Sequence, residues 1–172
     1  MSEWSLRLAR PEDAEQMPAI EARAGTLFET IEGIGDIAGQ HTIPVDRLQR
    51  YIRKGHSLVA HVDGAMAGFL VDEPFGRELH IWEVSVDPVH QQRGIGAGLV
   101  RACLIDAANS GYKAVTLTTF RDVPWNGLFY ARLGFEEVTA LDAHPRLAGE
   151  LAVEADQGLP PERRCAMINF LD

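Results

Sequence analysis

The feature that most constrains the fold of this 172-residue chain is a glycine-rich turn between two apolar segments. The first segment, residues 78–86, alternates like a strand and ends just before Pro88. After a polar loop, Gly94 and Gly96 open residues 94–109, in which apolar residues recur at helical spacing. The sequence therefore predicts a strand, a loop and a helix, with glycines at the N-terminus of the helix.

A helix N-terminus of this kind can hold an anion, because its first N–H groups have no partner within the helix. Glycine at positions 94 and 96 leaves no Cβ atom between a phosphate and the backbone, and Arg93 adds a fork of donors. The dinucleotide motif G-x-G-x-x-G and the Walker motif both fit this segment poorly. A glycine-rich helix start without any ligand stays open as the alternative.

Hydrophobic periodicity divides the whole chain into strands and helices. Strands are expected near residues 4–8, 57–62, 66–72, 78–86, 114–119, 135–138 and 164–170, and helices near residues 11–24, 44–55, 94–109, 124–133 and 148–155. Asp63-Gly64 between two strands predicts a type I′ hairpin turn. Because no repeat or linker interrupts the chain, we expect one α/β domain with a mixed sheet, its antiparallel hairpins first and a crossover later.

Charge and composition exclude several classes of function. Sixteen Lys and Arg against 25 Asp and Glu give a net charge of −9, which argues against non-specific binding to nucleic acid or anionic membranes. The first residues lack the features of a signal peptide, and the most apolar stretch, residues 94–108, is too short to span a bilayer. We therefore expect a cytoplasmic protein with Cys103 and Cys165 reduced, and no metal, because the six His residues show no ligand spacing.

Two motifs together carry a family resemblance. They comprise Gln91, Gln92, Arg93, Gly94, Ile95 and Gly96 in the glycine-rich turn, and Asn126, Phe129, Tyr130, Leu133, Gly134 and Phe135 further on. With their order and spacing, they resemble the GNAT superfamily of acetyl-coenzyme A-dependent N-acetyltransferases, over roughly residues 6–138. The resemblance implies a GNAT-like acyltransferase fold over residues 1–172, with a central mixed sheet that splays between two parallel strands and is flanked by helices.

The resemblance also implies how acetyl-coenzyme A, the expected co-substrate, is bound. The coenzyme would lie where residues 83–86 and residues 115–118 splay apart, and its pyrophosphate would rest on the backbone amides of the glycine-rich turn. Its pantetheine arm would pair with backbone groups of the first strand and with Asn126. The expected coenzyme-binding residues are Val84, Val86, Gln91, Gln92, Arg93, Gly94, Ile95, Gly96, Ala97, Asn126 and Tyr130.

Two residues are the expected catalytic groups by the same resemblance. Tyr130 would lie near the sulfur and donate a proton to the departing thiolate, unless it is only a half-buried aromatic. The acceptor amine, whose pKa is about 10, must lose a proton before it attacks. Glu83 is the leading candidate for the base, because related enzymes commonly carry Glu at this point; Glu29, His80 and water are the alternatives.

The acceptor-binding site is less well defined by the sequence. Phe28, Trp82 and Trp125 could form a wall of this site, although each also suits ordinary packing. Residues 139–163 depart from the minimal family pattern and could form an extra helix that serves as a lid, an acceptor wall or a dimer contact, so monomer and homodimer both stay open. The expected activity is acetylation of a primary amine of a small molecule; a protein N-terminus or lysine as acceptor, and a coenzyme A-binding sensor without catalysis, are the alternatives.

Overall fold

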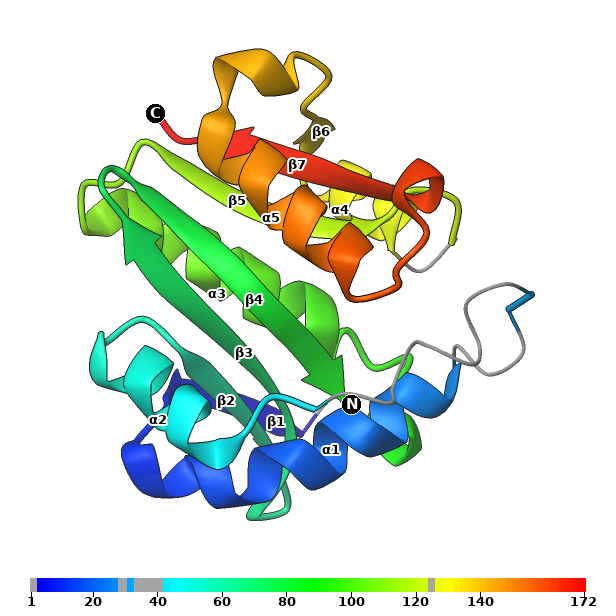
Figure 1. Cartoon of the computed structure of the whole chain (residues 1–172). Helices are drawn as coiled ribbons and strands as arrows, with labels where there is room; N and C mark the ends of the chain where they lie inside the picture. The colour runs from blue at the N-terminus through cyan, green and yellow to red at the C-terminus, as the bar shows by residue number, and fades with distance from the viewer. Residues whose placement is uncertain (1–2, 28–30, 33–41, 124–125) are drawn as a thin grey trace.

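The predicted strands pair with one another in one mixed sheet (Figure 1). The structure, a computed structural model, describes residues 3–27, 31–32, 42–123 and 126–172. Within these residues the strand order is β1-β2-β3-β4-β5-β7-β6, and every neighbouring pair is antiparallel except β4 and β5, which are parallel. The strands are β1 (Trp4–Leu8), β2 (Leu58–Val62), β3 (Ala65–Phe75), β4 (Glu78–Val86), β5 (Ala114–Phe120), β6 (Glu136–Glu137) and β7 (Arg164–Phe170).

Helices cover both faces of this sheet, with α3 and α4 on one face and α1, α2 and α5 on the other (Figure 1). The α-helices are α1 (Met17–Gly25), α2 (Val45–Arg53), α3 (Ile95–Asn109), α4 (Gly127–Arg132) and α5 (Pro145–Asp156). Short 3-10 helices are η1 (Pro11–Gln16), η3 (Pro88–His90), η4 (Leu141–Ala143) and η5 (Pro161–Arg163). The expected α/β architecture, a mixed sheet flanked by helices, is therefore confirmed.

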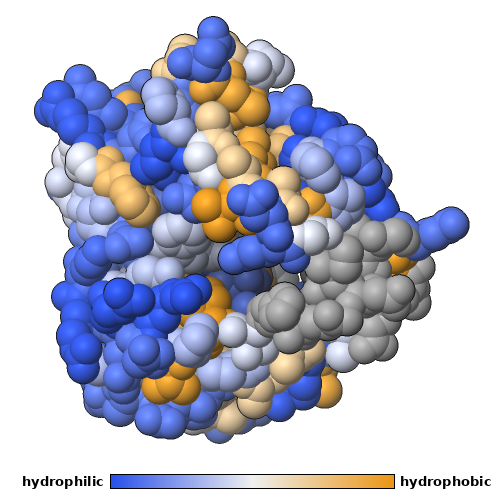
Figure 2. Space-filling model, in the orientation of Figure 1, coloured by the Kyte–Doolittle hydropathy of each residue, from blue (hydrophilic) through white to orange (hydrophobic). Residues whose placement is uncertain are grey.

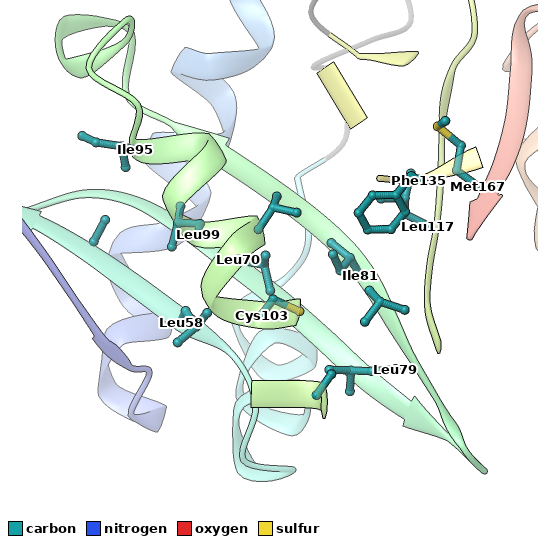
Figure 3. Close-up of a cluster of buried hydrophobic side chains, with 14 of the residues drawn as sticks. Leu58, Leu70, Leu79, Ile81, Ile95, Leu99, Cys103, Leu117, Phe135 and Met167 are labelled. Carbon is teal, nitrogen blue, oxygen red and sulfur yellow. The ribbon is translucent and has the colours of Figure 1, made fainter. Parts of the chain in front are cut away.

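Two clusters of buried side chains hold the layers together, one on each face of the sheet. Ile95, Leu99 and Cys103 follow one side of α3 and lie against the sheet beside Leu70 (Figure 3). Met17 of α1 is fully buried in the second cluster. Each large apolar side chain that is fully buried stabilises the fold by about 1.5–3 kcal/mol, so these clusters fix how the helices lie on the strands.

The hairpin between β2 and β3 has the predicted turn. Asp63 and Gly64 have φ values of 51° and 82°, the positive values that a type I′ turn requires. β6 is shorter than the strand predicted over residues 135–138. The difference arises because the N–H of Phe135 donates to the carbonyl of Tyr130 and closes α4, so that strand pairing begins only after it.

The extra helix between β6 and β7, α5, lies across β5 and β7 and is fastened at both ends (Figure 1). Near its N-terminus, Arg146 donates to Glu78 at 2.7 Å and to the hydroxyl of Thr116 at 2.9 Å. Near its C-terminus, Glu154 accepts a hydrogen bond from Arg164 at 3.0 Å. α5 begins three residues earlier than predicted, because the ring of His144 accepts a hydrogen bond from its first turn.

Candidate active site

The parallel strands β4 and β5 are paired only at their beginnings. Their register joins Glu78–His80 to Ala114–Thr116 and extends no further among the described residues. Beyond this point β4 continues to Val86 while still pairing with β3 on its other side, and the two parallel strands diverge (Figure 1). The N–H and C=O groups of residues 81–86 that face β5 thus form an open strand edge inside the sheet, which an extended ligand can pair with.

This opening agrees with the predicted splay between the two strands, with one difference. The sequence placed the divergent part of the second strand at residues 115–118, but Val115 and Thr116 are still paired with Leu79 and His80. The opening on β5 therefore begins after Thr116, two residues later than predicted. On the β4 side it includes Glu83, Val84 and Ser85, which lie in the predicted range.

A β-bulge in β4 decides which side chains border this opening. Two consecutive residues of β3 pair with Ile81 and Glu83, which leaves Trp82 as an extra residue in β4. Strict alternation would place Glu83 on the same face as Ile81, against α3. The bulge instead directs both Trp82 and Glu83 towards α1 and returns Val84 to the core beside α3.

The Glu83 carboxyl is surrounded by groups from several elements. Ser85 donates to it at 3.0 Å, and the carboxyl of Glu21 on α1 lies close enough to change its pKa. Burial raises the pKa of Glu83, the negative charge of Glu21 raises it further, and the positive charge of Arg164 lowers it in part. The raised pKa of Glu83 lies closer to the pKa of an amine, which makes the Glu83 carboxylate a better base.

Tyr130 lies on α4 and shares this environment. Its half-buried ring contacts Phe129 and Phe135 edge-on, with centroids 5.0 and 5.7 Å away. Burial raises the pKa of Tyr130, and the charge of Glu83 raises it further. The phenol therefore keeps its proton at neutral pH and can donate it, so the two predicted catalytic residues lie within electrostatic reach of each other.

The glycine-rich turn has the backbone that its sequence requires. Gly94, the N-cap of α3, has a φ of 83°, and Gln92 has a φ of 64°. The loop is held from two sides, because Trp4 donates to the carbonyl of Arg93 and the side chain of Gln91 donates to the carbonyl of Val86, both at 3.1 Å. These contacts fix the turn beside the end of β4.

Gly98, in the first turns of α3, is required by the packing of Trp4. A Cβ atom at Gly98 would lie 2.4 Å from the ring of Trp4, closer than two such atoms can approach. Glycine at this position lets Trp4 reach the loop that it holds. The sequence did not reveal this contact, since the two residues are more than 90 positions apart.

The turn and the open strand edge together fit a ligand that carries both phosphates and amides. Gly94 is the N-cap of α3 and has no side chain, so it cannot accept hydrogen bonds from the first N–H groups of the helix. The space beside it is open, since a Cβ atom at Gly94 would meet no described heavy atom within 4 Å. The open edge of β4 ends next to this turn. Phosphates suit the helix start, and amides suit the strand edge.

The predicted acceptor residues are only partly described. Trp82 donates to Glu73 at 3.1 Å and stacks on Tyr51, with ring centroids 5.8 Å apart. His80 is 1% exposed, its Nδ1 lies 2.8 Å from the Thr116 hydroxyl, and burial lowers its pKa to about 3. The remaining candidates, Phe28, Glu29 and Trp125, lie outside the described residues.

The face that carries Glu83 is hollowed between its two helical parts. Figure 2 shows the hollow between the part that α5 covers and the part that α1 and α2 cover, with hydrophilic residues on both rims. α5 therefore forms one side of this hollow, and α1 with α2 forms the other.

Glu21 is the residue of this site that the sequence prediction missed. It lies on α1 in register with Met17, Ile20 and Ala24, at positions i, i+3, i+4 and i+7 of one helical face. A carboxylate within an otherwise apolar stripe was the available signal. Its Oε1 accepts a hydrogen bond from the N–H of Ile43 at 2.8 Å, and burial raises its pKa.

Among the residues that the structure describes, no group of three His, Cys, Asp or Glu side chains is arranged to hold a metal ion. In the same part of the chain, none of the helices has the length and apolar character needed to cross a membrane. Cys103 and Cys165 are buried and not joined to each other.

A family model for the acetyltransferase (GNAT) domain matches residues 53–137, which run from the end of α2 to β6 and contain both sequence motifs. The chain therefore belongs to the GNAT acetyltransferase family. The predicted resemblance is confirmed.

Solved structures share this fold over nearly the whole chain. PaiA N-acetyltransferase from Thermoplasma acidophilum, in complex with coenzyme A, is 15% identical with a TM-score of 0.72, and 99% of each chain is covered. The ribosomal-protein-S18-alanine N-acetyltransferase from Escherichia coli is also 15% identical, with a TM-score of 0.71 over 98% of this chain and 94% of that one. YncA, a putative acetyltransferase from Salmonella typhimurium with acetyl-CoA, is 17% identical with a TM-score of 0.68, over 99% and 95%.

Proposed function

We propose that this GNAT acetyltransferase transfers the acetyl group of acetyl-coenzyme A to a primary amine of a small molecule in the cytoplasm. The observation that carries the proposal is the open edge of β4, which contains Glu83, ends beside the glycine-rich turn and has Tyr130 within electrostatic reach of Glu83. Coenzyme A or acetyl-CoA is present in structures of PaiA and YncA, which have the same fold.

Coenzyme binding would use mainly backbone groups. Val84 and Val86 would offer N–H and C=O groups to the pantetheine arm, and the amides of residues 92–97 would bind the pyrophosphate. Asn126, at the start of α4, would hydrogen-bond the same arm. Bound acetyl-CoA supplies the acetyl group as a thioester.

The side chains of this chain would manage the protons. Glu83 would take a proton from the acceptor nitrogen, which leaves the amine neutral and able to attack. Tyr130 would keep its own proton until it donates it at the position of the sulfur. A backbone N–H on the open edge of β4 would stabilise the developing oxyanion.

A small acceptor is favoured by the position of α5. This helix forms one side of the hollow on the face of the sheet towards which Glu83 points, and it is fastened to the sheet by Arg146 and Glu154. A fixed wall limits the room for a peptide running across this face. The acceptor wall is therefore the role that we favour for residues 139–163.

The test is to measure thiol release from acetyl-CoA with a panel of amines, amino acids, N-terminal peptides and lysine peptides. We expect release with at least one small amine, and roughly 10²-fold less with the Glu83→Gln variant. Faster release with peptides than with any small amine would identify a protein acetyltransferase. Tight coenzyme binding without release for any acceptor would identify a sensor and would contradict the proposal.

A further inference from the structure

Glu21 and Glu83 come from different elements, and their carboxyl groups lie close enough to influence each other's protonation. Glu21 lies on α1, and Glu83 lies in the bulged part of β4. Two ionised carboxylates repel each other at close range, so one proton shared between them stabilises the pair. In that form the pair carries one negative charge rather than two.

Neutral donors hold both carboxyl groups in place. The N–H of Ile43 donates to Oε1 of Glu21 at 2.8 Å, and the hydroxyl of Ser85 donates to Oε1 of Glu83 at 3.0 Å. From the other elements packed against Glu83, the charged and titratable groups are Arg164 on β7 and Tyr130 on α4. Burial raises the pKa of both glutamates, and the charge on Glu21 raises that of Glu83 further.

We propose that Glu21 is a positioning residue for the base: it holds the Glu83 carboxyl by sharing a proton and, once ionised, makes that carboxyl a stronger base towards the acceptor amine. This inference rests on the proposed function, because it assigns Glu21 a part in the same proton transfer. A single buried glutamate would lack the second negative charge that strengthens the base.

The proton transfer balances in atoms and charge. The shared proton first leaves to solvent, so that both carboxylates are ionised when the alkylammonium group of the acceptor arrives. One N–H bond of the acceptor then breaks, its proton binds an oxygen of Glu83, and the nitrogen keeps the electron pair. The positive charge on the nitrogen and one of the two negative charges on the pair are neutralised together, which suits a site away from water.

The pair is tested directly by NMR titration of the glutamate carboxyl carbons in the coenzyme-free protein. In the wild type we expect the Glu83 signal to titrate in two coupled steps. In Glu21→Gln, whose side chain has nearly the same volume and donates an N–H, we expect one step at a pH lower by about one unit or more. Glu15→Gln, an exposed change on η1, is the matched control and should leave the titration unchanged. An unchanged Glu83 titration in Glu21→Gln would overturn the inference.

The pH dependence of turnover is the second readout. In Glu21→Gln the rising limb of kcat/KM should move to lower pH by the same amount as the NMR titration, and the alkaline plateau should fall. If the titration moves but the limb does not, Glu21 has no part in the proton transfer. Should Glu21→Gln fail to fold, Glu83→Gln serves instead, and Glu21 should then titrate in a single step rather than in coupled steps. If no amine is acetylated, the proposed function fails, whereas the titrations still decide whether the pair shares a proton.

Discussion

At the scale of single residues, two neighbouring negative charges suit two side chains to opposite proposed tasks. The charge around Glu83 raises the pKa of Tyr130, and the charge of Glu21 raises the pKa of Glu83, in both cases in addition to burial. A phenol with a raised pKa stays protonated at neutral pH and is a donor. A carboxyl with a raised pKa binds protons more tightly and is a better acceptor, so the environment separates acid from base.

The proposed role of Tyr130 as proton donor gives the first prediction. Tyr130→Phe removes only the hydroxyl, and we expect kcat to fall roughly 10²-fold because the departing thiolate loses its proton donor. Coenzyme affinity should change by less than about twofold, since the expected contacts with the pantetheine arm and pyrophosphate come from other groups. Steady-state kinetics and calorimetric titration with coenzyme A measure the two effects separately.

The matched control is Tyr112→Phe. The hydroxyl of Tyr112 lies 3.3 Å from the His56 ring, in the connection between α3 and β5 and away from the open edge of β4. This variant should keep both kcat and affinity. Wild-type turnover in Tyr130→Phe would remove Tyr130 from catalysis.

At the scale of elements, the two ends of α3 offer a matched pair of glycines. Gly94 before the helix and Gly111 after it have φ values of 83° and 87°, and a Cβ atom at either would meet no described heavy atom within 4 Å. Alanine at either position should therefore cost about 1 kcal/mol of unfolding free energy through backbone strain alone. Urea unfolding measures this loss, which we expect to be the same for both variants.

Only the substitution at the N-terminal end should affect the coenzyme. Gly94→Ala places a methyl group where the phosphates are expected, so coenzyme A should bind about tenfold more weakly, a loss of about 1.4 kcal/mol. Gly111→Ala should bind coenzyme A like the wild type. Equal affinities in the two variants would show that the pyrophosphate binds elsewhere.

The order of elements could be predicted from the sequence, but the bulge could not. Periodicity placed the strands and helices in the right order, because each buries one face and repeats apolar residues accordingly. The same rule assumes that strand residues alternate, so it would put Glu83 on the face of Ile81. The signal that contradicts it, three positions rather than two between Ile81 and Val84, is also found where a strand simply ends.

Glu21 shows a second limit of the sequence prediction. The interaction between Glu21 and Glu83 depends on how α1 lies on the sheet, and no local pattern encodes the distance between a helix and a strand 60 residues away. The position of α5 could not be predicted either, since the ion pair near its N-terminus joins Arg146 to Glu78, 68 residues away. A motif can therefore name candidate site residues, whereas a partner that tertiary packing adds cannot be predicted from it.

At the scale of the whole molecule, a second buried carboxyl affects stability. Asp72 on β3 is 1% exposed, and burial raises its pKa to about 8. Its Oδ2 accepts a weak hydrogen bond from Cys103 at 3.6 Å, and its Oδ1 has no hydrogen-bond partner in the described part of the chain. Asp72 is therefore largely protonated at neutral pH in the folded protein and ionised in the unfolded chain.

This difference predicts how stability depends on pH. Because the folded pKa lies above the unfolded one, the folded state holds a proton that the unfolded chain has lost, so stability falls as pH rises from about 4 to about 8. In Asp72→Asn this fall should be smaller, and between pH 5 and pH 8.5 the variant should gain roughly 3 kcal/mol relative to the wild type.

Urea unfolding at the two pH values measures the gain, with the exposed Asp63→Asn as control. The control should follow the wild type at both values. Parallel pH dependences for Asp72→Asn and the wild type would mean that Asp72 is ionised in the folded state.

The extra residue in β4 allows this strand to change in length by one residue without turning its side chains over. If Trp82 were deleted, Glu83 would follow Ile81 directly and keep Val71 as its partner, so β4 would return to simple alternation against β3. Glu83 would then still face α1, and Val84 would still lie beside α3. A deletion of Trp82 should therefore remove its stacking on Tyr51 and its hydrogen bond to Glu73, yet leave the expected catalytic and coenzyme-binding groups in place.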